Sequence, residues 1–170
     1  MFTFTEHVDV MAQPDEIFNV VGDLMARGHY FPGSVLFIRE MAPRPPSETE
    51  KFLPGQKISF TNNGESRTST IVSVEEWDKA EAVIAEEVGS SAKVETITWR
   101  LSELLQGTVR VMVHFEAEFG MVEKMSKGPA ARKFYSETLE RLKKFCEDKQ
   151  DFAGPRTYAP KPVPIDPLNP

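Results

Sequence analysis

The 170-residue sequence has very little of several features that mark particular protein classes. Its one cysteine, Cys146, excludes an intramolecular disulfide, and the apolar helical pattern around it predicts a packed thiol. No window approaches the roughly 18 apolar residues that a membrane-spanning helix needs. The segment from Met1 to Glu6 lacks the basic and apolar regions of a signal peptide. We therefore expect a cytoplasmic protein with no integral membrane segment.

Basic residues are also in the minority, with 20 Lys and Arg against 26 Asp and Glu and a net charge of -6. Nucleic acids and anionic membranes bind proteins through basic patches, so this balance argues against both partners. The basic residues between 132 and 144 are interleaved with glutamates, as on a solvated helix face with ion pairs. We expect no nucleic-acid partner.

Motifs for metal, phosphate and covalent chemistry are missing as well. His7, His29 and His114 have no metal-ligand spacing, and a single cysteine makes a zinc site improbable. The sequence contains no nucleophile elbow, no phosphate-binding glycine loop and no dinucleotide fingerprint. We predict no metal and no cofactor, and these patterns leave any catalytic residues unknown.

What the sequence does contain is an ordered series of short alternating segments followed by one long helix. Residues 2–10 alternate as a half-buried strand, and Pro14 begins a short helix that residues 27–33 end. Further strands are predicted at residues 35–41, 57–61, 67–77, 79–88, 94–105 and 109–119. Residues 121–150 are amphipathic and helical, with Pro129 as a first-turn residue or a kink. This order predicts an α+β fold with helices on one side of an antiparallel sheet.

The long helix has only the sheet to pack against, and a sheet that curls around a single helix tends to enclose a hollow. This organisation indicates a container. Residues 151–170 are rich in proline and are expected to be extended or disordered. We therefore predict one domain over residues 1–150 and a Pro-rich tail over residues 151–170.

Several segments resemble the START-like superfamily, which includes the Bet v 1-like proteins and the polyketide cyclase/dehydrase and lipid-transport family. The matching segments are residues 12–18, Asp23 with residues 30–33, residues 54–56, residues 106–110 and residues 139–144. The resemblance implies a helix-grip fold. In that fold a curved antiparallel sheet of about seven strands wraps a long C-terminal helix, with two small helices after the first strand.

Members of this superfamily hold lipids, sterols, polyketides, plant hormones or quinones, and some cyclise or dehydrate polyketides. Our leading interpretation is a carrier or sensor that binds a small hydrophobic ligand, such as a lipid, polyketide or isoprenoid-like molecule, between sheet and helix. One alternative is an enzyme that uses a cavity carboxylate or tyrosine as acid or base. Another is a protein-interaction module that acts through its acidic surface and tail. The expected state is a monomer or a homodimer.

The expected cavity residues follow from the inward faces of the strands and of the long helix. Glu6 and Glu95 share faces with apolar residues, although both can instead reach solvent or pair with Arg132. For the aromatic residues a filled core is the simpler alternative, and for His29 a packed or solvated loop position is the simpler one. The expected lining residues are Glu6, His29, Tyr30, Phe60, Asn62, Glu95, Ile97, Trp99, Val113, Phe115, Met125, Arg132 and Tyr135.

Overall fold

A computed structural model describes residues 1–33, 35–40, 54–62, 65–78, 80–90 and 93–152 of the chain. The elements follow one another as a strand, two short helices, six further strands and a long helix. They are β1 (Phe2–Val10), α1 (Pro14–Gly22), the 3-10 helix η1 (Leu24–His29), β2 (Val35–Glu40), β3 (Lys57–Asn62), β4 (Glu65–Asp78), β5 (Glu81–Ser90), β6 (Lys93–Leu105), β7 (Thr108–Ala117) and α2 (Met121–Phe152).

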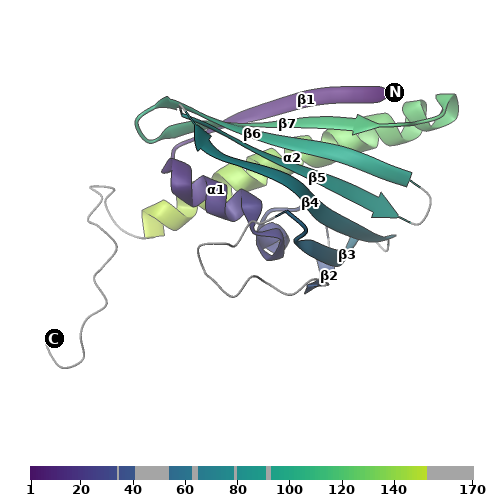
Figure 1. Ribbon diagram of the computed structural model, residues 1–170, viewed down its shortest axis with the longest axis horizontal. Coiled ribbons are helices and arrows are strands. Elements are labelled where there is room, and N and C mark those ends of the chain that lie inside the picture. The colour runs from purple at the N-terminus through teal and green to yellow at the C-terminus, as the bar shows by residue number, and fades with distance from the viewer. Residues whose placement is uncertain (34, 41–53, 63–64, 79, 91–92, 153–170) are drawn as a thin grey trace, which may run out of the picture.

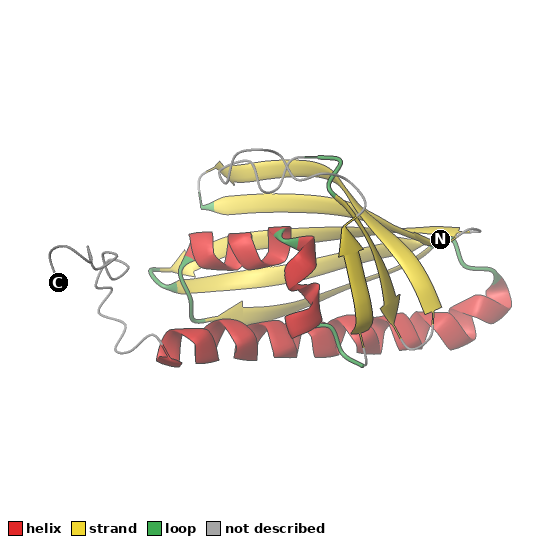
Figure 2. Cartoon of the chain, turned by 90° about the horizontal axis from the view of Figure 1, so that it is seen from below, coloured by secondary structure: helices red, strands yellow, loops and turns green. Residues whose placement is uncertain are grey.

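The strands form one antiparallel sheet in the order β1-β7-β6-β5-β4-β3-β2. Strands β2 to β7 are a meander, whereas β1 and β2 occupy opposite edges, so the chain between them must cross the sheet. It does so through α1 and η1, which lie beside α2 on the same face of the sheet (Figures 1 and 2). Register shifts in β4 bend the sheet. The predicted α+β helix-grip fold is confirmed.

The core lies between this face of the sheet and the helices. Strand β7 shows why, because every second residue from Val109 to Ala117 is buried while the intervening side chains are partly exposed. Its register with β6 places Val113 opposite Trp99 and Phe115 opposite Ile97. Apolar alternation in neighbouring strands therefore produces one continuous apolar surface.

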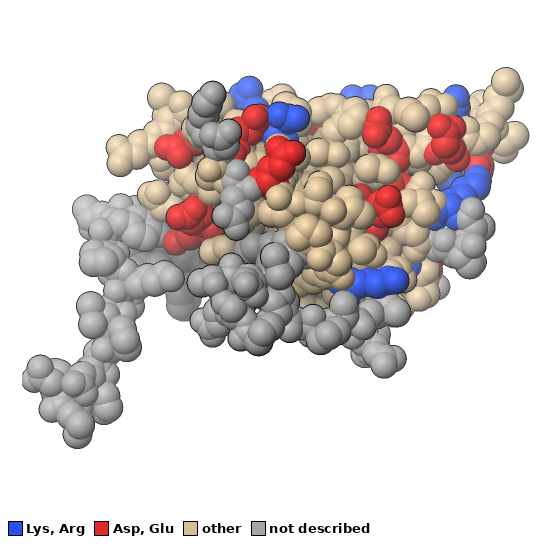
Figure 3. Space-filling view, in the orientation of Figure 1, with Lys and Arg blue, Asp and Glu red and all other residues tan. Residues whose placement is uncertain are grey.

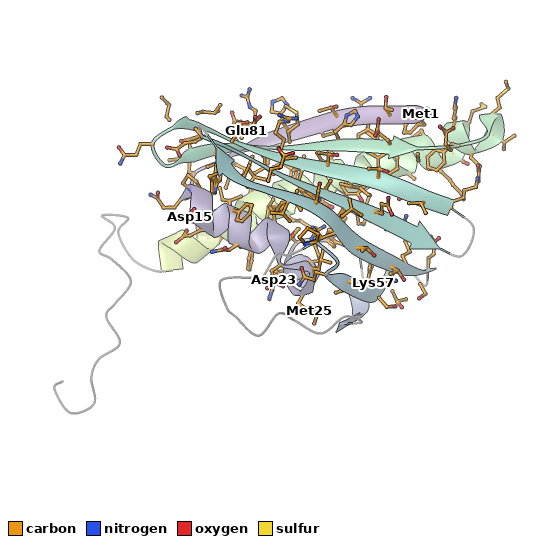
Figure 4. All side chains as sticks on the ribbon, viewed as in Figure 1. Met1, Asp15, Asp23, Met25, Lys57 and Glu81 are labelled. Carbon is orange, nitrogen blue, oxygen red and sulfur yellow. The ribbon has the colours of Figure 1, made fainter. Side chains whose placement is uncertain are left out.

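The two short helices begin where the sequence supplies the required local contacts. Pro14 occupies the first turn of α1, where its missing N–H costs no helical hydrogen bond. Asp23 separates the helices, and its side chain accepts a hydrogen bond of 3.0 Å from the Met25 amide at the start of η1. Figure 4 labels Asp23 and Met25 at this corner, below the sheet.

Helix α2 begins at Met121, and Pro129 lies inside it. The interpretation of Pro129 as a first-turn residue is therefore wrong; the helix accepts the loss of one backbone hydrogen bond. Near this point Gly128 lies against β1, and a Cβ on it would be 2.8 Å from the Phe2 ring. A small residue is needed there for α2 to approach the sheet. None of the helices within the described ranges is long and apolar enough to cross a membrane.

Glu123 holds the start of α2 through its carboxylate, so the stability of this turn should depend on pH. Two hydrogen bonds to the Glu123 carboxylate lower its pKa to about 2. The bond from Lys93 has the larger effect, and the bond from the Gly120 amide has the smaller one. Because this pKa is lowered from the usual value of 4.5, the ionised carboxylate stabilises the fold at pH values above 4.5. This contribution to stability is lost as the pH falls toward about 2. We expect the first turn of α2 to fray over that interval.

The Gly120 amide chemical shift, followed by NMR from about pH 6 to about pH 2, reports this transition. In Glu123→Gln the acidic titration of the amide should disappear. A Gly120 amide that responds identically in both proteins would contradict this prediction.

The predicted tail of residues 151–170 is described only at its first two residues, which complete α2. Residues 153–170 lie outside the described residues. The division into a domain of residues 1–150 and a Pro-rich tail stays a prediction.

Candidate functional site

A groove of about 290 Å³ lies between the first half of α2 and the sheet, and we call it the outer groove. Its apolar wall comes mostly from α2, because Ala130, Ala131, Phe134 and Tyr135 all line it. Phe119, just after β7, completes this wall. Small alanines beside two aromatic rings leave room for a ligand next to flat apolar surfaces.

The rest of the outer groove is charged. Its charged lining residues are Glu65, Arg67, Glu95 and Lys127. Arg67 of β4 donates a hydrogen bond to Glu95 of β6, and their side chains are only 23% and 17% exposed. Burial alone would lower the pKa of Arg67, but the Glu95 carboxylate raises it above its usual value. Arg67 therefore keeps its charge, with Glu95 as its partner of opposite charge.

A second space, the inner pocket, has a volume of about 10 Å³. It shares Arg67, Phe134 and Tyr135 with the outer groove, so these side chains stand between the two spaces. The volume is enough for about one water-sized group. The remaining lining residues are Arg27, Phe31, Ile58, Phe60, Ser69, Glu86 and Val88.

The floor of the inner pocket is a buried ion pair between η1 and β5. Arg27 donates hydrogen bonds of 3.2 and 2.8 Å to the two carboxylate oxygens of Glu86, and one of 3.0 Å to the Val21 carbonyl. The two side chains are 2% and 1% exposed. Burial opposes the charge of Arg27, but Glu86 outweighs it and raises the pKa of the guanidinium above its usual value.

Aromatic rings surround this guanidinium. Its central carbon lies 4.9 Å from the ring centre of Trp99, 5.3 Å from that of Phe31 and 5.9 Å from that of Tyr30. Cation–π contacts of this kind are strongest where water is excluded. They help to hold Arg27 in place at the inner end of the site.

Three polar atoms at the inner pocket have no hydrogen-bond partner among the described residues. They are Nε of Arg27, Nε of Arg67 and Oγ of Ser69. Buried polar groups are nearly always paired in folded proteins, because an unpaired one costs free energy.

Tyr135, like Phe134, lines both spaces. Burial raises the pKa of its hydroxyl far above the usual value, and the nearby Glu86 and Glu95 carboxylates add to this effect. The phenol stays protonated at neutral pH. It can donate a hydrogen bond, but it is a poor base.

The structure brings three of the sequence-predicted residues to these spaces. Tyr135 lines both of them, Glu95 lines the outer groove, and Phe60 lines the inner pocket. Four other expected lining residues, Ile97, Trp99, Val113 and Phe115, line neither space and are buried in the packed core. The filled-core alternative describes them better, because α2 packs directly against the sheet.

Glu6 and Arg132 also lie outside both spaces. They form an ion pair with each other, with the Arg132 side chain 61% exposed, as the alternative interpretation allowed. Met125 is 81% exposed and lines neither space.

The remaining expected residues lie near the η1 corner or outside the described part. His29 is exposed and stacks on Phe145 with ring centres 4.9 Å apart. Tyr30 is buried and donates a hydrogen bond of 3.2 Å to the Val20 carbonyl. Neither lines the outer groove or the inner pocket. The side chain of Asn62 lies outside the described residues.

Sequence reasoning missed Arg27, Arg67, Ser69 and Glu86. A signal for Glu86 was present, because the buried face of β5 contains Ala82, Ile84 and Val88 at alternate positions and Glu86 falls between them. A glutamate inside such an alternation predicts a buried partner of opposite charge. No comparable signal marks Arg27, because a short helix gives no clear inward face.

Within the described ranges, no set of three or more His, Cys, Asp or Glu residues is arranged to hold a metal ion.

The structure is similar to several solved proteins, although no protein-family model matches the sequence and no curated protein is similar to it in sequence. A hypothetical protein from Helicobacter pylori is 14% identical with a TM-score of 0.67 over 85% of this chain and 87% of that chain. A START superfamily protein from Mycobacterium smegmatis is 17% identical with a TM-score of 0.59 over 90% and 99%.

A third similar structure is the di-domain ARO/CYC BexL from the BE-7585A biosynthetic pathway. It is 17% identical, with a TM-score of 0.63, and the match covers 91% of this chain. This chain spans about half of BexL, or 48% of its length. These similarities show that the chain has the START-like helix-grip fold, as the sequence resemblance implied.

Proposed function

We propose that the protein binds a small, largely apolar molecule in the outer groove, as a carrier or sensor. One observation carries this proposal: an aromatic and alanine wall on α2 lies across a groove of about 290 Å³ from a small set of charged side chains on the sheet. Apolar walls with a few convergent polar groups are typical of small-molecule sites. The START-like fold of the chain is consistent with such a site between sheet and helix.

The volume of the outer groove limits the size of the ligand. About 290 Å³ is at the lower end of the range of small-molecule sites, roughly 300–1,000 Å³. A compact molecule of one or two rings fits this space better than a whole diacyl lipid. A larger ligand would require Phe134 and Tyr135 to move away from the sheet.

The enzyme alternative has one observation in its favour, because Glu95 and Tyr135 share the groove. However, Arg67 already binds the Glu95 carboxylate, and burial keeps the Tyr135 phenol protonated. Neither group is therefore ready to remove a proton, so we favour binding over catalysis.

Location and assembly remain part of the proposal. We keep a cytoplasmic location and a monomer or homodimer as expectations. On the face in Figure 3, described basic side chains are scattered among acidic ones. The absence of a nucleic-acid partner also stays a prediction, as does a role for the tail in protein interaction.

Blocking the outer groove tests the binding proposal. Ala131→Trp places an indole in the groove, whereas Met125→Trp places the same group on the exposed face of the same helix. All three proteins would be purified from the native host, incubated with a host metabolite extract and examined by native mass spectrometry. We expect wild type and Met125→Trp to retain a small molecule and Ala131→Trp to lose most of it.

Circular dichroism and thermal unfolding would first confirm that both variants fold. Equal retention by Ala131→Trp and wild type would place the ligand elsewhere. Failure of wild type to retain any molecule would overturn the binding proposal.

A further inference from the structure

We infer that two copies of the chain associate through the outer edge of β1, which pairs antiparallel with the same strand of the second copy. The interface is separate from the proposed ligand site, because no residue of β1 lines the outer groove. The inference goes beyond the proposed binding function. It depends on the backbone groups at this edge, on a contrast between the two edges of the sheet, and on one two-fold register.

Two hydrogen bonds with α2 indicate which backbone groups of β1 point away from β7. Lys143 donates a hydrogen bond of 2.7 Å to the Asp9 carbonyl, and the Met11 amide donates one of 2.9 Å to Glu147. In an antiparallel strand, every second residue directs both its N–H and its C=O to the same side. The residues of β1 that share the outer edge with Asp9 are therefore Thr3, Thr5 and His7.

These three residues, which we call the open residues, leave the outer edge unpaired. Their side chains are exposed, and their outward backbone groups have no hydrogen-bond partner among the described residues. The bonds with α2 cover the edge only from Asp9 onward. In Figure 1, β1 runs along the upper rim of the sheet, and no described strand lies beyond it. Each open residue thus presents one donor and one acceptor to an incoming strand.

The two edges of the sheet differ in how they are protected. Edge strands of soluble proteins are usually short or interrupted by bulges, because an open edge recruits other strands. Strand β2, at one edge, has six residues and a register shift between Val35 and Phe37. Strand β1, at the other edge, has nine residues, pairs with β7 without a shift and contains neither proline nor lysine. The edge of β1 is therefore the one that suits a partner strand.

The open residues define how two copies pair. A two-fold axis exchanges the two strands, so each contact occurs twice. With the axis at Thr5, this residue lies opposite Thr5 of the second copy, and Thr3 lies opposite His7 of the second copy. All the open residues then bond to one another. Moving the centre by one residue in either direction leaves an open residue opposite one that is not open, such as Asp9, whose carbonyl α2 already binds.

The side chains are compatible with this register. Directly opposed threonines are a favourable cross-strand pair, and like charges are not. Glu6 is the charged residue on the inner face of β1, and it lies opposite Phe4 of the second copy. Arg132 of its own chain already binds the Glu6 carboxylate. No like charges therefore meet along the paired strands.

Analytical ultracentrifugation of three proteins tests the interface. Thr5→Pro removes the N–H at the centre of both strands, and the free side of an edge strand tolerates proline. Thr5→Val is the matched control, because it also loses the hydroxyl that contacts His114 but keeps the N–H. We expect wild type and Thr5→Val to dimerise between about 10 μM and about 1 mM, as suits a small interface. Thr5→Pro should dimerise at least about tenfold more weakly.

Cysteine crosslinking tests the register. Residues directly opposite each other in a hydrogen-bonded pair have Cα atoms about 5.5 Å apart, a distance that a disulfide spans. Thr5→Cys should therefore form a crosslinked dimer under mild oxidation. In Thr3→Cys the two cysteines are displaced by about 13 Å along the strands and should not crosslink. Cys146 is buried and does not compete.

Each result has a definite consequence once circular dichroism has confirmed the fold of the variants. A wild type that stays monomeric over this concentration range would overturn the inference, as expected if a strand of another protein occupies the edge. A dimer that Thr5→Pro leaves unchanged would use another surface. Equal crosslinking of Thr3→Cys and Thr5→Cys would overturn the register. If Thr5→Pro does not fold, the two cysteine variants decide.

Discussion

Replacement of Glu86 by glutamine is expected to lower the free energy of unfolding by about 3–5 kcal/mol. The substitution leaves the Arg27 guanidinium buried between aromatic rings without a counter-charge, and desolvation of an unpaired charge is very costly. Urea denaturation monitored by circular dichroism measures the loss. Glu87→Gln is the matched control, because this neighbouring residue is exposed, and it should change the free energy by less than about 0.5 kcal/mol.

The double variant Arg27→Met, Glu86→Leu separates two contributions to the free energy of unfolding. One is the net contribution of the ion pair, and the other is the cost of leaving one charged partner unpaired. Because a buried ion pair gains little over apolar residues of similar volume, the double variant should be more stable than Glu86→Gln. A Glu86→Gln protein as stable as wild type would show that Arg27 finds another partner or reaches solvent.

Truncation of Tyr135 to alanine is expected to lower the free energy of unfolding by about 3 kcal/mol or more. Its ring lies 5.7 Å from that of Phe115, 6.2 Å from that of Phe4 and 6.3 Å from that of Trp99, so it is the main aromatic contact of α2 with the sheet. Thermal and urea unfolding both measure the effect. The same truncation should join the outer groove to the inner pocket.

Tyr135→Phe is the control that keeps the ring. No hydrogen bond from the Tyr135 hydroxyl is present among the described residues, so removing this oxygen should change the free energy of unfolding by less than about 1 kcal/mol. A large loss in Tyr135→Phe would mean that the hydroxyl has a structural partner. A small loss in Tyr135→Ala would mean that other residues of α2 hold the helix on the sheet.

The fold could be predicted because its strands and its long helix have clear hydrophobic periods. Val109, Val111, Val113 and Phe115 alternate over a strand that is buried on one face, and the structure keeps that alternation. The residues of α2 from Tyr135 to Cys146 repeat at helical spacing and are buried as expected. Local patterns of this kind determine secondary structure and the face that each element buries.

The candidate site could be predicted only in part, because it depends on contacts between distant segments. Arg27 and Glu86 are 59 residues apart and meet only because η1 crosses the sheet. The sequence predicts a hollow between the long helix and the sheet, but the Tyr135 ring packs there against the rings of Phe4, Trp99 and Phe115. Periodicity shows which residues face inward; it does not show whether their side chains pack together or enclose a cavity.

The position of β1 has a consequence for how the chain folds. This first strand pairs with β7, and the hydrogen bond between Asp9 and Arg110 joins residues 101 positions apart. During synthesis β1 leaves the ribosome long before its partner, so its apolar face has no strand to pair with until β7 has been made. Contacts at such separation slow folding, because a long loop must close first. In any chain released before β7 is complete, β1 therefore stays an unpaired strand that is prone to aggregation.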